Sequence, residues 1–451
     1  MGEYYPFFKA YDVRARVPEE LDWDLAYRIG RAYVAELGAA TVVVGRDMRL
    51  TSAGLADTLI EGLTDAGADV LDIGLCGTEE VYYATFNEAA DGGIMVTASH
   101  NPRDYNGMKF VREQARPISS DTGLFDIERT AYHNDFPTPA RIGERRELDH
   151  RPGYIDFLLD QIKPERLKPL KIVANPGNGC AGLVVEALEK RLPFEIERLH
   201  FEPDGNLPNG IPNPLLPENR EATAGAVREH GADFGVAWDG DFDRCFFFDE
   251  RGEFIEGYYI VGLIAQMLLA MNPGAAIVHD PRLTWNTLAQ VADSGGRTVQ
   301  SKSGHSFMKQ AMREADALYG GEMSAHHYFR DFAYADNGNI PWLVIAQLIS
   351  ETGKPLSTLV AERIAAYPAS GEINREIADP GAALADMEQY YGDAAESIEK
   401  VDGLSMDFGD WRFNLRKSNT EPVVRLNVET RGDIDLMHAK TDELLARLGA
   451  E

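Results

Sequence analysis

Three aspartates alternate along one short segment of the chain, at Asp239, Asp241 and Asp243. An apolar run typical of a buried β-strand, residues 234–238, comes directly before them. Carboxylates at this spacing can converge on one hard cation, and their oxygen atoms suit Mg²⁺. A calcium-binding EF-hand loop needs glycine at its sixth position, where this chain has Arg244, so we reject that alternative. A solvated acidic turn is the simpler alternative, but carboxylates packed beside apolar strands repel one another unless a bound cation or Arg244 neutralises them. We predict a Mg²⁺ site.

A serine that could carry a covalent group follows a second apolar run, residues 93–96. His100 stands beside Ser99, and Lys109 follows further along the chain. A nucleophilic serine needs a base and positive charge of this kind nearby. The segment lacks the G-x-S-x-G pattern of serine hydrolases. Taken alone it is more typical of a capping serine in a loop, so its chemistry depends on the other segments.

Polar side chains also group after a third apolar strand, where Glu322, Ser324 and His326 follow one another at alternate positions. His305 ends another polar segment earlier in the chain. Such side chains can bind sugar hydroxyls, and histidine can move protons near neutral pH. A helix cap with buried histidines is an equally good interpretation of this pattern.

The segment that begins at Arg416 combines a guanidinium with the hydroxyls of Ser418 and Thr420 and the amide of Asn419, and Arg425 lies just beyond it. These groups, with the N–H groups of a turn, match what a phosphate monoester needs for bidentate and main-chain hydrogen bonds. A solvated β-turn is the alternative.

The charge of the whole chain helps to choose between these interpretations. Its 451 residues include 73 acidic and 44 basic ones, which gives a net charge of −29. So acidic a chain lacks the basic stripe of a general nucleic-acid binder. An anionic substrate must therefore be attracted locally, and cations do stand in or beside nearly every segment described above: Arg14, Lys109, Arg244, Arg282, Arg416, Lys417 and Arg425.

Other features of the composition predict a globular cytoplasmic protein. Hydrophobic residues make up 44% of the chain, and its three cysteines have neither disulfide-framework nor zinc-site spacing. The beginning of the chain shows no secretion signal or lipid anchor. The longest apolar run, residues 258–271, is shorter than the roughly 20 residues of a membrane span, so we expect a buried helix there and no membrane partner.

The elements that must position these residues are strands that alternate with helices from about residue 41 to 328, which predicts mostly parallel sheets with helices on their faces. Open sheets of this kind bind ligands at the carboxyl ends of their strands. After residue 371 the pattern becomes strictly alternating, with apolar Trp411, Phe413 and Leu415 separated by polar residues. This period indicates an antiparallel sheet with one polar face. The fold class is therefore α/β, with three mixed α/β domains and a C-terminal α+β domain.

Five segments together resemble one family along the whole chain and in the right order: KAYDVR (9–14), TASHNPRDYNGMK (97–109), DGDFDR (239–244), GEMSAHHYF (321–329) and RKSNTEP (416–422). The chain is similar to the α-D-phosphohexomutase superfamily, and within it to the bacterial phosphomannomutase/phosphoglucomutase branch. The resemblance implies an isomerase with a four-domain, heart-shaped arrangement, in which each domain gives one segment to a central cleft. Polar stretches with Pro or Gly at 134–153, 249–252 and 367–371 predict domains at residues 1–145, 146–252, 253–368 and 369–451. The resemblance implies that these carry, in order, a phosphoserine loop, a metal-binding loop, a sugar-binding loop and a phosphate-binding segment.

The resemblance also implies a reaction, the reversible interconversion of mannose 6-phosphate and mannose 1-phosphate through a phosphoserine and a hexose 1,6-bisphosphate, with glucose phosphates as further substrates. Mg²⁺ is the implied metal, and a hexose 1,6-bisphosphate is the implied activator. The implied partner is the phosphorylated hexose, and we expect a monomer or homodimer. Ala325 and the doubled His326 and His327 look most like the phosphomannomutase version of the sugar loop. Ala15 and Arg282 depart from residues common in the family, glycine and lysine respectively.

The resemblance assigns roles to individual residues by their place in the motifs. Ser99 carries the transferable phosphate and, with Asp239, Asp241 and Asp243, completes the metal site. Arg14, His100, Lys109 and His326 are the other implied catalytic residues, of which Arg14 and Lys109 face the phosphoserine and His326 is a proton-transfer candidate. The implied substrate-binding residues are Tyr11, Arg244, Arg282, His305, Glu322, Ser324, Arg416, Ser418, Asn419, Thr420 and Arg425.

Several alternatives stay open at this point. Within the family they are phosphoglucomutase and phosphoglucosamine mutase, although the latter typically has glutamine where this chain has Met323. An aspartate-nucleophile phosphatase would place the phosphoryl group on Asp239 and leave Ser99 without a role. A calcium- or sugar-binding protein would bind without turnover. The glycines at 177, 179 and 182 match a dinucleotide fingerprint in form, but we favour a tight strand-to-helix turn.

Overall fold

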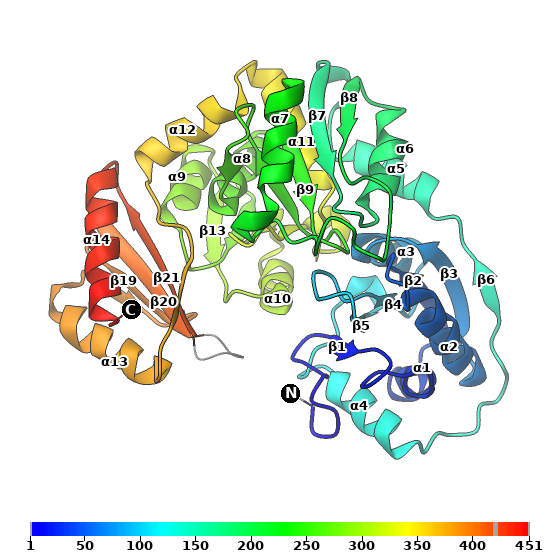
Figure 1. Cartoon of the computed structure of the whole chain (residues 1–451). Helices are drawn as coiled ribbons and strands as arrows, with labels where there is room; N and C mark the ends of the chain where they lie inside the picture. The colour runs from blue at the N-terminus through cyan, green and yellow to red at the C-terminus, as the bar shows by residue number, and fades with distance from the viewer. Residues whose placement is uncertain (1, 418–422, 450–451) are drawn as a thin grey trace. The chain divides into compact units, whose positions relative to one another are not determined.

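The computed structural model describes residues 2–417 and 423–449, which form two compact units (Figure 1). The first unit contains the residues up to 254 together with 331–352, and the second contains 255–330 and the residues from 353 onward. Short 3₁₀ helices occur at Glu113–Ala115, Pro164–Arg166, Pro217–Asn219, Arg330–Phe332 and Gly392–Ala394. Each unit carries two of the predicted sheets.

The first sheet of the first unit has the strand order β1-β5-β4-β2-β3-β6. Strands β2, β3, β4 and β6 are parallel to one another, whereas β5 runs antiparallel to both β4 and β1. Helices α1, α2 and α4 share one hydrophobic core with one face of the sheet, and α3 packs on the other face. The bounds are β1 (Val13–Arg16), α1 (Trp23–Leu37), β2 (Thr41–Arg46), α2 (Ser52–Asp65), β3 (Asp69–Leu75), α3 (Thr78–Asn87), β4 (Gly92–Val96), β5 (Tyr105–Arg112), α4 (Leu124–His133) and β6 (Arg145–Glu147).

The local sequence explains these elements. Strand β4 is buried at every position, as expected for a strand covered by helices on both faces. Helix α1 begins where the Asp22 side chain accepts a hydrogen bond from the N–H of Leu25 at 2.8 Å. It ends at Gly38, whose φ of 65° gives the left-handed conformation that glycine adopts without strain.

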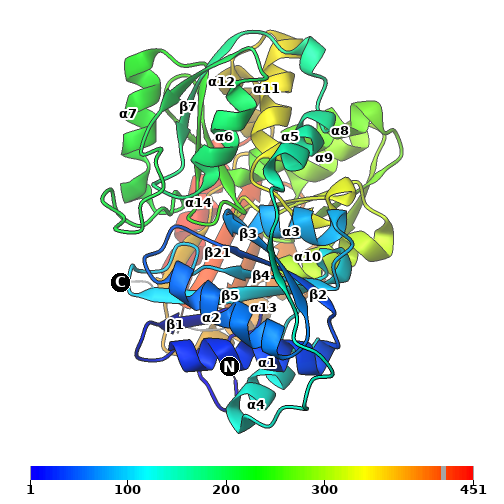
Figure 2. The same cartoon turned by 90° about the vertical axis from the view of Figure 1, so that its right-hand side faces the viewer.

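The second sheet of the first unit has the order β11-β10-β9-β7-β8, and Figure 2 shows α7 on one side of β7 and α6 on the other. Its strands β7, β8 and β9 are parallel, and β10 returns antiparallel to β9. The glycine-rich segment after β7 leads into α6, as the tight-turn interpretation predicts. The bounds are α5 (Arg151–Asp160), β7 (Leu170–Asn175), α6 (Ala181–Glu189), β8 (Phe194–Arg198), α7 (Glu221–His230), β9 (Phe234–Trp238), β10 (Cys245–Phe248), β11 (Phe254–Ile255), β16 (Ala335–Asp336) and α11 (Ile340–Thr352).

The second unit contains a sheet with the order β13-β12-β14-β15, in which β12, β13 and β14 are parallel and β15 is antiparallel to β14. The apolar run at 258–271 forms the buried helix α8, which confirms that prediction. Within the described part of the chain, no helix is both long and apolar enough to span a membrane. The bounds are α8 (Gly257–Met271), β12 (Ala276–His279), α9 (Trp285–Asp293), β13 (Arg297–Gln300), α10 (His305–Ala315), β14 (Tyr319–Gly321), β15 (His327–Phe329) and α12 (Leu356–Ala366).

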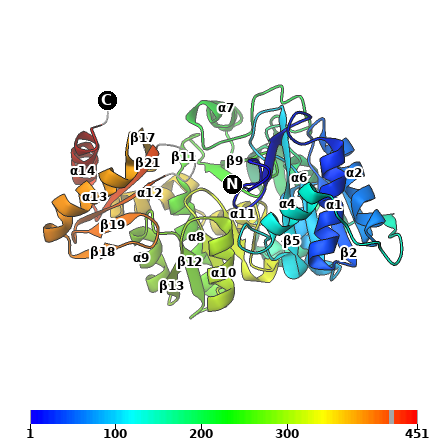
Figure 3. The ribbon, with the colours of Figure 1, turned by 90° about the horizontal axis from the view of Figure 1, so that it is seen from below.

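The C-terminal sheet has the order β17-β21-β20-β19-β18 and is antiparallel throughout, as the alternating pattern predicts. Its apolar face packs against α13 and α14 (Figure 3). Its other face carries the polar positions of β20 and β21, so Arg416 and Arg425 lie opposite each other. The bounds are β17 (Ile373–Glu376), α13 (Pro380–Tyr391), β18 (Ser397–Glu399), β19 (Leu404–Asp407), β20 (Trp411–Lys417), β21 (Val423–Thr430) and α14 (Ile434–Arg447). The predicted α/β fold class, with an antiparallel C-terminal domain, is therefore confirmed.

Candidate active site

Ser99 lies in the loop after β4, where its backbone is held in an uncommon conformation. Its φ of 46° is left-handed, a region that residues other than glycine seldom adopt. The Thr97 hydroxyl accepts a hydrogen bond from the N–H of Ser99 at 2.9 Å and donates to Asp47 at 2.7 Å. A buried guanidinium, that of Arg49, donates to the Ser99 carbonyl oxygen at 2.8 Å. Surrounding contacts thus fix a strained serine, as is common at functional sites.

The Ser99 hydroxyl faces a carboxylate and an imidazole. Its Oγ donates to Asp239 Oδ2 at 2.9 Å and lies 3.0 Å from His100 Nδ1. The loop that carries Asp239 comes very close to the serine loop, because a Cβ atom on Gly240 would lie only 2.4 Å from the Ser99 carbonyl oxygen. Glycine at 240 is what permits this approach.

The three aspartates of the loop after β9 form one buried cluster. Each offers a carboxylate oxygen, and these oxygens lie within 4.8 Å of one another. Asp241 Oδ1 has no hydrogen-bond partner among the described residues although it is buried. A buried carboxylate oxygen without a donor is costly, and a hard cation would remove that cost. The donor set therefore fits the divalent cation that the sequence predicts.

Two cations, one on β5 and one in the loop after β9, neutralise these carboxylates. Lys109 on β5 places its Nζ 2.6 Å from Asp241 Oδ2 and 2.5 Å from Asp243 Oδ2, while Arg244 Nη2 lies 2.6 Å from Asp239 Oδ2. Burial opposes ionisation of Asp239, but the Arg244 guanidinium outweighs it and lowers the Asp239 pKa to about 2. Burial likewise opposes the charged form of Lys109, yet Asp241 and Asp243 outweigh it and raise the Lys109 pKa.

Arg14 and His100 complete the cluster in the first unit. Arg14 on β1 donates to Asp12 and to the side chain of Asn101, both at 2.8 Å. The second bond holds its guanidinium against the loop that carries Ser99. Burial and the neighbouring Arg244 charge lower the pKa of His100, so its ring is neutral near pH 7. Tyr11 lies just before β1 in the same unit.

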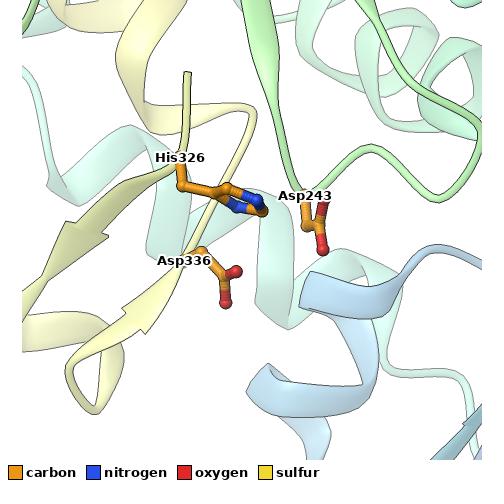
Figure 4. Close-up of side chains that lie close together, drawn as sticks. All are labelled: Asp243, His326 and Asp336. Atoms are coloured by element: carbon orange, nitrogen blue, oxygen red, sulfur yellow. The ribbon is translucent and has the colours of Figure 1, made fainter. Parts of the chain in front are cut away.

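A further carboxylate belongs to this region. Asp336 ends β16 and is buried, and one of its oxygens lies within 4.8 Å of an Asp243 oxygen (Figure 4). No motif in the sequence singled out Asp336. His326, also labelled in Figure 4, belongs to the second unit and lies just before β15.

The predicted sugar-binding residues lie beside Arg282 in the second unit. The Arg282 guanidinium makes a two-point contact with Asp280, at 3.0 and 2.8 Å, and its Nη2 lies 3.4 Å from Ser324 Oγ and 3.6 Å from Glu322 Oε1. Glu322 accepts from the N–H of Gly304 at 2.8 Å. His305 follows that glycine as the first residue of α10.

A carboxylate that the sequence analysis missed joins the predicted phosphate-binding cations. Glu372 lies 3.0 Å from Arg416, 3.5 Å from Arg425 and 3.6 Å from Arg282. Burial opposes ionisation of Glu372, but Arg282 and Arg416 outweigh it and lower its pKa. Three guanidiniums that converge in this way can bind an anion such as phosphate, and in this structure the Glu372 carboxylate takes that place. The remaining predicted residues of this site, Ser418, Asn419 and Thr420, lie outside the described residues.

Comparison with known proteins adds independent evidence. Four models of one protein family match successive parts of the chain: phosphoglucomutase/phosphomannomutase alpha/beta/alpha domain I at residues 6–138, domain II at 152–252, domain III at 256–367 and the C-terminal domain at 372–446. A phosphomannomutase of Salmonella montevideo is 60% identical over 450 residues, covering 98% of this chain and 99% of the relative. One of Escherichia coli K12 is 58% identical over 448 residues, covering 98% of each.

Solved structures show the same similarity. A phosphoglucomutase/phosphomannomutase family protein of Burkholderia thailandensis matches with a TM-score of 0.88 and 32% identity, covering 99% of this chain and 98% of the other. A putative phosphomannomutase of Thermus thermophilus matches with a TM-score of 0.80, at 21% identity and the same coverage. The arrangement of elements is thus shared with these proteins over almost the whole chain.

Proposed function

This chain belongs to the phosphoglucomutase/phosphomannomutase family, and from that premise we propose that it is an isomerase that interconverts mannose 6-phosphate and mannose 1-phosphate. The observation that carries the proposal is the Ser99 hydroxyl, which bonds Asp239 inside a cluster of three carboxylates and several cations. A serine so placed is suited to carry a phosphoryl group and to return it to a sugar. Phosphomannomutase relatives that are close to 60% identical over the full length favour mannose as the sugar.

Asp239, Asp241 and Asp243 would hold Mg²⁺, with an oxygen of phosphorylated Ser99 as a further ligand. The unpartnered Asp241 Oδ1 supports this assignment. When bound, Mg²⁺ would supply charge neutralisation at the phosphoryl oxygens. A hexose 1,6-bisphosphate would serve as activator by phosphorylating Ser99.

The residues of the first unit support a phosphoryl transfer in which atoms balance. The bond between phosphorus and Ser99 Oγ breaks, a bond from phosphorus to the sugar hydroxyl oxygen forms, and the hydroxyl proton passes to a protein base and finally to Ser99 Oγ. Arg14 and Lys109 would stabilise the charge spread over the phosphoryl oxygens of a loose transition state. His100, neutral and 3.0 Å from Ser99 Oγ, is placed to exchange that proton, and His326 is the proposed base at the sugar.

The second unit would hold the substrate. Glu322 and Ser324 are proposed to bind sugar hydroxyls, with His305 nearby, while Arg282, Arg416 and Arg425 bind the phosphate that is not reacting. Ser418, Asn419 and Thr420 remain predicted members of that phosphate site. The bisphosphate intermediate must then turn over, so that its other phosphate returns to Ser99.

Two other activities make different predictions. A phosphatase that uses Asp239 as nucleophile is disfavoured, because Asp239 already accepts from Ser99, from the Arg244 side chain and from the Arg244 N–H at 3.3 Å. Phosphoglucomutase or phosphoglucosamine mutase activity would use the same serine and differ only in the sugar. Relative kcat/KM for mannose, glucose and glucosamine phosphates decides among these.

The experiment that tests the proposal is mass spectrometry of the purified protein after incubation with glucose 1,6-bisphosphate and Mg²⁺. We expect one phosphate on Ser99 that mannose 1-phosphate discharges, none in Ser99→Ala, and normal labelling in Ser120→Ala, a control on the same domain. An unlabelled Ser99, or a hydroxylamine-labile phosphate on Asp239, would overturn the proposal.

A further inference from the structure

Thr78 is the first residue of α3, and it contacts Asp241 in the loop that carries the three aspartates (the aspartate loop, residues 239–244). The two residues are 163 positions apart in the sequence. Its Oγ1 donates to Asp241 Oδ2 at 2.6 Å, and its N–H donates to the Asp241 carbonyl oxygen at 3.1 Å. Thr78 is fully buried. We propose that Thr78 is a positioning residue that orients the Asp241 carboxylate toward the divalent cation, an inference that rests on the metal site of the proposed function.

The two oxygens of Asp241 have different surroundings, and this difference carries the inference. Oδ2 accepts from Thr78 Oγ1 and from Lys109 Nζ, each at 2.6 Å. Oδ1 accepts from no described residue, although it is buried. With both donors on Oδ2, rotation of the carboxylate would break two short hydrogen bonds. Oδ1 is therefore held as the oxygen that is offered to the cation, in the way that outer partners commonly orient metal ligands.

Lys109 by itself does not impose this orientation. Its ammonium also bonds Asp243 at 2.5 Å, and it sits at the end of a flexible chain of four methylene groups. Thr78 instead contacts the same residue at two points, one on the side chain and one on the backbone. A β-branched side chain at the start of a helix has few rotamers, so its hydroxyl is fixed in direction.

The first turn of α3 is held in place by contacts with residues 338 and 339 and with Phe242 of the aspartate loop. The Glu79 carboxylate accepts from the N–H of Gly338 and the side chain of Asn339, each at 2.5 Å. The Gly338 carbonyl oxygen accepts from the Trp238 indole at 2.9 Å, and Trp238 is the last residue before the aspartate loop. On the opposite side, a Cβ on Gly77 would lie 2.1 Å from the Phe242 ring, so the ring packs directly on the helix start. Thr78 thus approaches Asp241 from a rigid support.

Calorimetric titration of Mg²⁺ into the full-length, unphosphorylated enzyme tests the inference without any sugar. Thr78→Val keeps the shape and loses the donor, and we expect its Mg²⁺ affinity to fall about tenfold, the lower end of the range for outer partners of metal ligands. Thr78→Ser keeps the donor and should bind within about threefold of the wild type. Thr85→Val is the matched control, because Thr85 is buried on the same helix and its hydroxyl bonds only the carbonyl of Val81, at 2.7 Å. Its affinity should match the wild type.

Equal Mg²⁺ affinity in Thr78→Val and the wild type would overturn the inference, and so would a Thr78→Ser variant as weak as Thr78→Val. If Thr78→Val does not melt cooperatively, Thr78→Ala takes its place with the same criteria. A wild type that binds Mg²⁺ but does not isomerise mannose phosphates would refute the proposed function and leave this inference standing. A wild type that binds no Mg²⁺ would refute the inference directly.

Discussion

Arg49 donates from Nη2 to the carbonyl oxygen of Ser99 at 2.8 Å, so the backbone of the proposed phosphoserine is held by a buried guanidinium. The same nitrogen donates to the Asn101 carbonyl at 2.6 Å, and Nη1 donates to the carbonyls of Pro102 and Tyr105 at 2.7 and 2.9 Å. Four carbonyl groups, three in the loop after β4 and one on the first residue of β5, therefore converge on a single side chain. This geometry explains how the left-handed conformation of Ser99 is maintained.

Replacing Arg49 by lysine should loosen the serine loop, because one ammonium cannot reach four carbonyls that a planar guanidinium serves. We expect kcat to fall by about ten- to a hundredfold, as is common when positioning is lost, with KM little changed. Steady-state assays with mannose 1-phosphate measure this, with Arg46→Lys on β2 as control. An unchanged kcat in Arg49→Lys would contradict the assigned role.

Gly240→Ala should disturb the contact between the serine loop and the aspartate loop. The added Cβ would lie 2.4 Å from the Ser99 carbonyl oxygen, so one backbone must move. We expect the rate of Ser99 phosphorylation by glucose 1,6-bisphosphate to fall about tenfold or more, since misplacement by about 1 Å can cost a hundredfold in rate. Gly225→Ala in α7 is the control. Its Cβ meets only side-chain atoms at 3.6 Å or more, and it should raise stability by about 0.5–1 kcal/mol. Normal labelling of Ser99 in Gly240→Ala would contradict the prediction, because it would mean that the close contact between the serine loop and the aspartate loop is not needed for phosphorylation.

Glu372→Gln should strengthen the binding of inorganic phosphate. The carboxylate occupies the centre of the Arg282, Arg416 and Arg425 group and competes with an incoming anion. Removing its charge should raise phosphate affinity about tenfold, equivalent to about 1.4 kcal/mol. Calorimetry with phosphate measures the effect. The control is Glu376→Gln, because Glu376 is exposed on β17, the strand that begins directly after Glu372. Weaker phosphate binding in Glu372→Gln would mean that Glu372 chiefly orients the arginines.

His327 should remain neutral well below the pH at which histidine ordinarily titrates. Burial, together with the neighbouring His326, lowers the pKa of His327 to about 3. Because the pKa is lower in the folded state than in the unfolded chain, this group contributes stability above about pH 6.5 that is lost as the pH falls toward 3, at about 1.4 kcal/mol per pH unit.

The direct measurement for His327 is its imidazole NMR signal, assigned by comparison with His327→Gln. We expect no titration between pH 8 and 5, and a shallower loss of stability on acidification in the variant. A His327 signal that titrates near pH 6.5 would contradict the prediction.

The sequence predicted the residues that stand in continuous motifs and missed those whose partners are distant. Alternating apolar strands and the aspartate loop are local patterns, so the sheets and the cluster at Asp239 could be foreseen. Arg49, Thr78 and Glu372 act on residues 50, 163 and at least 44 positions away. Only the folded chain brings them together. A threonine at the start of a helix and an isolated arginine or glutamate are common in any sequence, so none of them stands out before folding. Arg49 and Glu372 stand out only once the structure shows that these charged side chains are largely shielded from solvent.

Lys109 pairs with Asp241 and Asp243, and Arg244 pairs with Asp239. These pairs affect how strongly Mg²⁺ and a phosphate on Ser99 stabilise each other. Arg14 is also attracted by Asp241 and Asp243, although it pairs with Asp12 as well, so the permanent cations do not outnumber the carboxylates around them. A phosphate on Ser99 adds up to about two negative charges, which makes the region more favourable for the two positive charges of Mg²⁺. Mg²⁺ titrations of phosphorylated and unphosphorylated enzyme should therefore give the tighter Kd with phosphate present. By thermodynamic reciprocity, bound Mg²⁺ must then stabilise the phosphorylated form of Ser99 by the same free energy by which phosphorylation strengthens Mg²⁺ binding.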